Sequence, residues 1–444
     1  MMTPLEAREL ARKVVALTLA DEAEVLVAAE SSALTRFANN RINQNVAEDN
    51  ALINVRAVLG TRIGVASTNR LDDESLAACC EAAVAAARIA PEDPSFPGLP
   101  APEPAKEAVR ASESAREFDA EARARAVAAI IEPSRSRGLT AAGKVRVGTH
   151  VVAVANSHGI DVGMEVTGVQ ATVLSMGETG SGWASFLGQG TEGFDPAAMG
   201  EEAADIAIRS ANPTDLEPGT YPVVLGPEAV ADIMDFLGFM GFSAKAYEEG
   251  RSFMSNALES QVMTEYVNII DDATSPHAMG LTFDYEGAPK QRIPIIEEGV
   301  ALRPVTDSYW AEKSGFINSG HALPAPNSYG PLPLNLEMLG GDATLEELIG
   351  MVKYGVYVTR FHYVNVEDPV PVTLTGMTRD GTFLIEDGKL TRPLKNLRFT
   401  QGAVEALDGL EALTTERKFV GTEEGATLVP GIMLSAFNFT GQTT

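Results

Sequence analysis

Residues 151–190 read VVAVANSHGIDVGMEVTGVQATVLSMGETGSGWASFLGQG, and this stretch decides the fold. Four strand-like runs follow one another in it: VVAVANSHG, IDVGMEVTG, VQATVLSMG and GWASFLGQG. Glycine and an Asn-Ser pair bound the runs, which is typical of strands joined by tight turns. A helix is expected to begin at Asp195-Pro196, with Met199, Ala203 and Ile206 on one face. The stretch therefore predicts a unit of consecutive strands followed by a helix.

The same order of elements stands earlier in the chain. The run DEAEVLVAAE is expected to be a strand, and the strand-like runs SALTRFA, INQNVAE and ALINVRAVL follow it. Two turn-forming pairs, Asn39-Asn40 and Asp49-Asn50, separate these three runs. An Ala-rich helix is expected over residues 73–90. Because Asn39-Asn40 lines up with Asn156-Ser157, 117 residues later, the N-terminal half is predicted to contain two copies of one strand-strand-strand-helix unit.

Helices and a proline-rich segment complete the N-terminal half. Thr3 can cap a first helix, Pro4 suits its first position, and Glu6 completes a capping box. Residues 91–106 are rich in proline and are expected to cross between elements without forming a helix or a central strand. A further helix is expected over residues 119–131.

The pattern of apolar and turn-forming residues changes near residue 216. From there, short alternating runs are bounded by Gly, Asp and Pro, as in antiparallel hairpins, for example at Glu386-Asp387-Gly388. We therefore predict an α+β protein. Its N-terminal α/β domain is expected over residues 1–215, with two similar halves at about 1–106 and 107–215. A mainly antiparallel β domain is expected over residues 216–444.

Composition excludes several classes of partner. The chain has 444 residues, of which 45% are hydrophobic, and a formal net charge of -27. Such a charge repels phosphate backbones and anionic membranes, so neither nucleic acid nor a membrane is an expected partner. The two cysteines, Cys79 and Cys80, are adjacent and unsuited to pairing with each other, and no signal peptide or 18-residue apolar stretch is found. These features predict a cytoplasmic protein.

Four blocks of sequence carry a resemblance. GGDATLEELIGMVKYGVYVTRF spans residues 340–361, and TGMTRDGTFLIEDGKLTRPLKNLRFT spans residues 375–400. FDYEGAPKQRIPIIEEGV spans residues 283–300, and FANNRINQN lies at residues 37–45. In this order the blocks resemble the TldD/PmbA metallopeptidase family, whose older labels mention modulation of DNA gyrase. The resemblance covers nearly the whole chain.

The resemblance implies a fold and an activity. Members of this family pair an N-terminal α/β region with a C-terminal antiparallel β domain and usually form dimers. Catalytic members are zinc peptidases that cut or trim unstructured peptides. Their zinc motif, His-Glu-x-x-x-His, lies on a helix after a Gly-Pro that ends a strand, and a C-terminal cysteine is the third ligand. Two imidazoles and a further ligand hold the ion, and the Glu takes a proton from its water.

The chain departs from the family at this motif. Gly226-Pro227 is present, but the following helix, from Glu228 to Gly241, contains no histidine and has Phe and Met where ligands are expected. No cysteine follows Cys80. We therefore assign no metal ligand and no cofactor, and the chain resembles the PmbA-like, or TldE-like, half of a peptide-processing pair.

The remaining histidines offer few alternatives. His277 follows Asp271 and Asp272, and a metal site of these three is conceivable, although a structural loop histidine is the favoured interpretation. His321 and His362 lie in the family-like region and could orient a peptide carbonyl if they converge. The Gly-rich GETGSG lacks the lysine of a P-loop and is interpreted as a hairpin loop. No serine or cysteine triad stands out, so the catalytic residues stay unassigned.

These observations predict a subunit that assists a zinc-bearing relative. An unstructured peptide can add as a strand to an exposed sheet edge, which requires backbone groups more than special side chains. Arg360, Arg379 and Asp380 are the candidates for gripping the peptide, together with His362 and His321. The expected partner is a zinc-bearing TldD-like subunit or a second copy of this chain. Two alternatives stay open: a homodimeric hydrolase with a non-standard site, and a non-catalytic scaffold that binds peptides or proteins.

Overall fold

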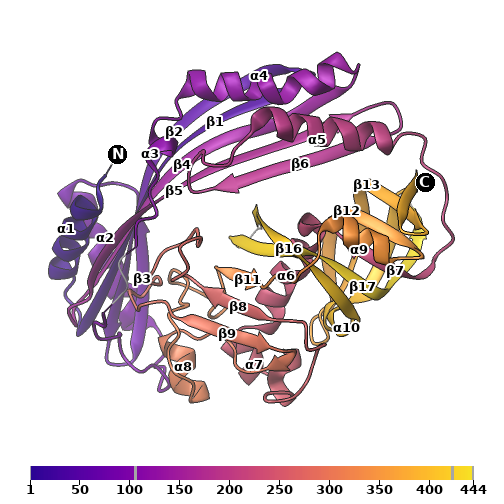
Figure 1. Cartoon of the computed structure of the whole chain (residues 1–444). Coiled ribbons are helices and arrows are strands. Elements are labelled where there is room, and N and C mark those ends of the chain that lie inside the picture. Colours follow the sequence, from indigo (N-terminus) through magenta and orange to yellow (C-terminus); the bar gives the residue numbers. More distant parts are fainter. Residues whose placement is uncertain (1, 105–107, 422–424, 443–444) are drawn as a thin grey trace.

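The computed structural model describes residues 2–104, 108–421 and 425–442, and it contains two β-sheets. A six-stranded sheet comes from the N-terminal half and an eleven-stranded sheet from the C-terminal half. Figure 1 shows the first sheet arching over the second, with helices along its outer face. In the described parts of the chain, no helix is long and apolar enough to cross a membrane.

The first copy of the repeated unit begins with a capped helix. Its elements are α1 (Pro4–Leu17), β1 (Glu22–Ala38), β2 (Arg41–Leu59), β3 (Arg62–Thr68) and α2 (Asp73–Ile89). The predicted capping box is confirmed: the Glu6 amide donates to the Thr3 hydroxyl at 3.2 Å, and the Thr3 amide donates to the Glu6 carboxylate at 2.7 Å. These two bonds satisfy backbone groups that the first helical turn would leave without partners.

The second copy repeats this order after a proline-rich crossing. Its elements are α3 (Glu113–Arg116), α4 (Ala120–Ser136), β4 (Thr140–Asn156), β5 (Asp161–Met176), β6 (Ser181–Gly188) and α5 (Pro196–Arg209). Residues 91–104 form neither helix nor strand, as predicted, and residues 105 and 106 of that segment lie outside the described residues, as does the predicted boundary at 106 and 107.

The strand order of the sheet confirms the duplicated unit. Its order is β3-β2-β1-β4-β5-β6, so the first strands of the two copies lie side by side at the centre. They run antiparallel, with Val25 opposite Ala155 and Ala33 opposite Val147. Each copy therefore extends outward from a shared centre, and each ends in a helix that covers its own strands.

One predicted turn is wrong. Asn39 and Asn40 do form a hairpin turn, with φ angles of 50° and 59°, but Asp49-Asn50 lies inside β2. There Asp49 pairs with Ser31 and Asn50 with Glu30. Ladder hydrogen bonds to the neighbouring long strand β1 outweigh the local turn preference of the Asp-Asn pair. Three strand-like runs are thus parts of two long strands, and in the second copy IDVGMEVTG and VQATVLSMG likewise form one strand, β5.

The two faces of this sheet pack against different partners. On the outer face, residues such as Val25 and Val55 pack with α1 and α2, while α4 and α5 cover the other end (Figure 1). On the inner face, Leu26 and Val154 pack against Phe283 from the C-terminal half. The alternation of side chains along β1 places Val25 and Leu26 on opposite faces, so both faces are buried where the C-terminal half lies.

The C-terminal half is built mainly from antiparallel strands, as predicted. Its elements are β7 (Gly219–Leu225), α6 (Pro227–Gly241), α7 (Ala244–Glu248), η1 (Phe253–Asn256), β8 (Ile269–Asp272), β9 (Arg292–Glu297), β10 (Val300–Ala301), α8 (Ser308–Ser314), β11 (Leu336–Met338), α9 (Leu345–Met351), β12 (Tyr354–Asp368), β13 (Thr373–Glu386), β14 (Lys389–Pro393), β15 (Leu397–Gly402), α10 (Ala403–Asp408), β16 (Leu410–Gly421) and β17 (Ala426–Gln442). Among the strand pairs of this sheet within the described residues, β11–β17 and β12–β7 are parallel and the others are antiparallel.

Five of these strands close on themselves. They follow the order β17-β15-β13-β12-β7, and β7 also pairs with β17. The predicted hairpin between β13 and β14 is confirmed, because Glu386 pairs with Lys389 and the two turn residues, Asp387 and Gly388, have positive φ angles of 46° and 73°. Helix α6, which follows β7, packs against β12, β16 and β17.

Candidate functional site

A cavity of about 800 Å³ lies between helix α6 and strand β12. It combines charged groups with aromatic and apolar side chains, and its lining residues are Asp232, Asp235, Phe236, Phe239, Met240, Tyr329, Arg360, Phe361, His362, Tyr363, Val364, Asn365 and Gly421. Pockets of this size, with few polar groups among apolar ones, are typical of ligand sites. We therefore take this cavity as the candidate site.

One wall of the cavity is a sheet edge without a neighbour. β12 pairs with β13 along most of its length, but on the other side β7 pairs only with Val356–Val358. Beyond Val358, no described strand pairs with this edge, and residues 360–365 line the cavity there. An open edge presents backbone donors and acceptors in a row, to which an extended chain can bind.

Arg360 lies where the two sheets meet. Its guanidinium stacks over the Trp183 ring from β6 at 4.2 Å, and its Nη1 lies 3.5 Å from the Asp380 carboxylate. Asp380 is buried, accepts a 2.6 Å hydrogen bond from the Ser181 hydroxyl, and lies 4.0 Å from Nε of Arg379. The structure thus brings the predicted residues Arg360, Arg379 and Asp380 together, with Asp380 orienting the guanidinium of Arg360.

His362 belongs to the same group and is held neutral. It lines the cavity two residues beyond Arg360 on β12. Burial lowers the pKa of His362, and the positive charges of Arg379 and Arg360 lower it further. A neutral imidazole offers one donor and one acceptor. It is therefore better suited to bind a peptide group than to bind a carboxylate ligand.

His321 lies elsewhere and does not meet His362 in a common site. Its ring is buried, with Nε2 2.9 Å from the Asp271 carboxylate and Nδ1 2.9 Å from the Ser319 hydroxyl. Burial lowers its pKa, and nearby Lys290 lowers it further. Because the side chain is enclosed, His321 holds loops of the C-terminal half together rather than contacting a ligand.

The conceivable metal site at His277 is not assembled. Asp271 is occupied by His321, and Asp272 accepts hydrogen bonds from Thr274 and Ser275. His277 is exposed to solvent. These contacts explain both aspartates as structural groups.

Helix α6 carries a polar face whose residues were not among the predicted site residues. Glu228, Asp232 and Asp235 stand at positions i, i+4 and i+7, so they lie on one side of an otherwise apolar helix. Glu228 accepts hydrogen bonds from Lys418 at 2.9 Å and from the Ser185 hydroxyl. The i, i+4, i+7 spacing of acids in an apolar helix was the available signal for this face.

Asp232 is a partly buried carboxylate of this face, and it lines the main cavity. Burial raises the pKa of Asp232 to about 7, and the neighbouring Arg360 opposes that rise. No described residue forms a hydrogen bond or an ion pair within 4.0 Å of it. It therefore faces the cavity as a desolvated acid without a direct partner.

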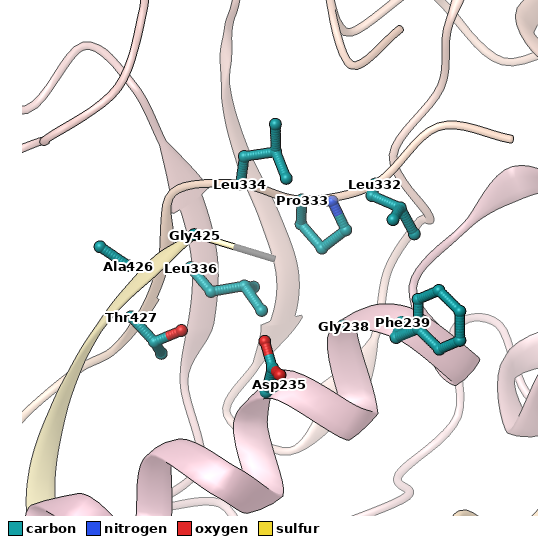
Figure 2. A pocket seen from close by; sticks show the side chains of 10 residues that line it. All are labelled: Asp235, Gly238, Phe239, Leu332, Pro333, Leu334, Leu336, Gly425, Ala426 and Thr427. Carbon is teal, nitrogen blue, oxygen red and sulfur yellow. The ribbon is translucent and has the colours of Figure 1, made fainter. Parts of the chain in front are cut away.

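Two smaller cavities adjoin the main one. Figure 2 shows Asp235 and Phe239 beside a cavity of about 10 Å³, roofed by residues 332–336 and the start of β17. That space holds about one water molecule. A second cavity, of about 360 Å³, lies on the far side of Arg360 and is lined by Trp183 and Glu228 among others. Of these three cavities the main one is the largest, and the open edge of β12 forms one of its walls.

The residues present do not fit the zinc site that the family resemblance implies. α6 begins at Pro227 and carries the acids Glu228 and Asp232 but no histidine. The thiols of Cys79 and Cys80 lie in α2, and burial raises the pKa of Cys79 to about 11. Within residues 2–104, 108–421 and 425–442, no three His, Cys, Asp or Glu side chains gather as a metal site. Glu228 is paired with Lys418, and carboxylates without an imidazole or a thiolate beside them are not a zinc donor set of the kind peptidases use.

Comparison with known proteins places the chain among its relatives. Models of the PmbA/TldA metallopeptidase match domain 1 at residues 23–87, the central domain at residues 97–211 and the C-terminal domain at residues 218–441. A metalloprotease TldD homolog of Buchnera aphidicola is 27% identical over 221 residues, covering 49% of this chain and 45% of that protein. A metalloprotease of Methanothermobacter thermautotrophicus is 25% identical over 274 residues, covering 59% of each. The matched region thus spans about half the length of these curated relatives.

Solved structures share the whole fold. TldE from Thermococcus kodakarensis superposes with a TM-score of 0.90 at 20% identity, covering 99% of this chain and 100% of that one. A Thermotoga maritima protein described as a candidate modulator of a DNA gyrase gives a TM-score of 0.87 at 18% identity, covering 97% and 99%. Because the C-terminal model alone matches residues 218–441, just over half of the 444 residues, the chain belongs to the PmbA/TldD metallopeptidase family.

Proposed function

We propose that this chain is the peptide-gripping subunit of a PmbA/TldD-type peptidase assembly and supplies no zinc ligand of its own. The observation that carries the proposal is the cavity of about 800 Å³, whose strand wall has an open edge and whose helical wall has no imidazole or thiolate. Such a site can hold an extended peptide but lacks the groups that activate water on a metal.

The open edge of β12 supplies most of the grip. A peptide laid along residues 360–365 pairs its backbone with strand groups that no described neighbouring strand occupies, so its side chains alternate between the cavity and solvent. Backbone pairing tolerates many sequences. This agrees with a role on unstructured peptides.

Arg360, His362, Arg379 and Asp380 fix the position of that peptide. Asp380 and the Trp183 ring hold Arg360 in place, so its guanidinium is oriented before the peptide arrives. Arg360 and the neutral His362 then hydrogen-bond peptide carbonyls, and the more exposed Arg379 adds a positive charge beside them. His321 has no part in this contact because it is enclosed.

The catalytic metal comes from a partner in this proposal. A zinc-bearing relative of the same family supplies it, and the two chains enclose the peptide between them. A homodimeric hydrolase is less favoured, because the two histidines available for it lie apart and one is buried. The net charge of -27 also directs the proposal toward peptides rather than nucleic acid.

The test measures metal and peptide cleavage separately. The chain is purified alone, a zinc-bearing family member from the same genome is purified alone, and the two are also expressed together. We expect zinc well below one ion per chain in this protein after dialysis, co-purification of the pair, and cleavage of a quenched unstructured peptide only by the mixture.

A matched pair of variants locates the effect. Arg360→Gln is expected to lower peptide cleavage by the mixture roughly tenfold, the loss of one charge-assisted contact. Arg62→Gln, in an exposed ion pair with Glu92, is expected to leave cleavage unchanged. Stoichiometric zinc in the isolated chain, or cleavage by the chain alone, would contradict the proposal.

A further inference from the structure

Not every charged side chain beside the main cavity has an ion-pair partner. Arg360 is neutralised by Asp380 at 3.5 Å, and Glu228 by Lys418 at 2.9 Å. Asp232 lines the cavity with no comparable cation at its own carboxylate. Its neighbours on the helix, Glu228 and Asp235, are also acidic, and His362 across the cavity is held neutral. Asp232 therefore remains at the α6 wall as an acid without an ion pair of its own among the described residues.

A desolvated carboxylate of this kind favours a cationic ligand. In a partly buried site, the attraction between opposite charges is screened less than in water, so one ammonium or guanidinium group gains a strong contact. Anionic or neutral groups gain nothing comparable there. The unpartnered acid thus distinguishes ligands by charge.

The other side chains of the cavity define what flanks that cation. Phe236, Phe239 and Met240 extend along the same helix, and the Tyr329 ring packs against Phe239 at 5.5 Å between ring centres. Tyr329 is 60% exposed although it faces the cavity, so part of this aromatic surface is uncovered. Aromatic faces attract apolar side chains and also cations.

We propose that the cavity selects peptide segments that carry a lysine or arginine next to an apolar side chain, with Asp232 accepting the cationic group. This inference rests on the proposed function, since it takes the ligand of the cavity to be an extended peptide. It adds a sequence preference to a grip that backbone pairing alone would leave unselective. The peptide runs along β12, directs its cationic side chain toward α6, and packs the apolar neighbour on the aromatic surface.

The test compares two peptides that differ at one side chain. Both are short, unstructured, capped at each end and labelled with a fluorophore. One carries lysine beside phenylalanine, and the other carries norleucine, which is similar in length but uncharged, in place of the lysine. Binding to the isolated full-length chain is measured by fluorescence anisotropy at low salt. We expect the lysine peptide to bind about tenfold more tightly, and added salt to reduce the difference.

Two variants assign the preference to a residue. Asp232→Asn keeps the shape of the side chain and is expected to bind both peptides with similar affinity. Asp408→Asn changes an exposed carboxylate at the end of α10, away from the cavity, and is expected to keep the tenfold preference. A preference that survives in Asp232→Asn would overturn the assignment.

The wild-type measurement alone distinguishes the charge preference from peptide binding itself. Equal binding of both peptides overturns the charge preference but leaves peptide binding in place. Binding of neither peptide overturns the proposed function and the inference with it. Neither result depends on whether a variant folds.

Discussion

At the scale of single residues, Asp232 stands out because the fold gains nothing from its charge. Burial raises its pKa to about 7, so the folded protein bears a penalty for ionising it at neutral pH. Groups kept in such an environment are characteristic of functional sites, where stability is exchanged for binding. The sequence alone did not predict Asp232 as a site residue, because an acid on a helix usually faces solvent.

Removing this charge is predicted to stabilise the protein in a pH-dependent way. The folded pKa of Asp232 is above its ordinary value of 3.8, so its contribution to stability is lost as pH rises through about 7. Arg360 from β12 opposes the penalty, and Glu228 and Asp235 add to it. Asp232→Asn should therefore raise the free energy of unfolding by about 2 kcal/mol at pH 8.

This gain should shrink as the pH falls from 7 toward 3.8, because the wild-type carboxyl is protonated in both states only below that ordinary value. Denaturant unfolding at several pH values measures it. An equal gain at every pH, or none at pH 8, would show that the carboxyl is not desolvated as described.

The candidate residues of the site were partly predictable for a local reason. Arg360 and Arg379 are register partners on neighbouring strands, and Asp380 follows directly, so sequence blocks that form one hairpin bring them together. Trp183 comes from the other sheet, and no local pattern places it under Arg360. His321 was grouped with them only by its position in the chain, and its true partner, Asp271, lies 50 residues earlier.

At the scale of elements, long strands were harder to predict than helices. The α1 capping box is a local signal and was found, whereas β2 runs through the turn-like pair Asp49-Asn50 because β1 supplies partners on both sides of that pair. Turn propensity is weak compared with a ladder of hydrogen bonds that only the folded sheet provides. Strand length is therefore set by the neighbour rather than by the strand's own residues.

The two copies of the repeated unit share a packing device. Gly64 on β3 lies against the backbone of Ala83 and Ala87 in α2, and Gly182 on β6 lies against Ala203 and Ala207 in α5. A Cβ at either position would overlap main-chain atoms of the helix. In both copies, the third strand thus lets its own helix approach closely.

Gly64→Ala and Gly182→Ala are each predicted to destabilise the protein by about 1–3 kcal/mol, because a helix must move away from its sheet. Gly168→Ala, whose added methyl meets open space, is the control and should be neutral within about 0.5 kcal/mol. Chemical denaturation of the three variants checks this. Similar stability for all three would refute the close-approach argument.

At the scale of the whole molecule, a buried ion cluster joins the six-stranded sheet to a turn of the C-terminal half. Arg56 on β2 contacts Glu24 on β1 at 2.9 Å and Glu286 of the C-terminal half at 3.0 Å. Burial raises the pKa of Glu24 to about 7, although Arg56 opposes the rise. Contacts 230 residues apart in the chain leave no local signature, so the sequence did not predict how the halves meet. The division at residue 215 stays a prediction.

Arg56→Met is predicted to cost about 3–5 kcal/mol at pH 8, because it leaves two carboxylates buried without a cation. Protonation relieves them, so the loss should shrink toward pH 5. Arg62→Met, which removes only the exposed pair with Glu92, should cost less than about 0.5 kcal/mol. Thermal unfolding at both pH values measures the difference, and a loss independent of pH would argue against buried, charged carboxylates.

The closed ring of the C-terminal half has a consequence for synthesis. β7 is complete at Leu225, but β17, which pairs with it, begins only at Ala426, about 200 residues later. At ribosomal rates of roughly 5–20 residues per second, β7 and α6 wait on the order of 10–40 s for that strand. The six-stranded sheet has no such delay, since its strands all lie before Gly188. During synthesis, the six-stranded sheet can therefore fold while the apolar strands of the C-terminal half are still exposed. This interval is when we expect chaperones to bind the nascent chain.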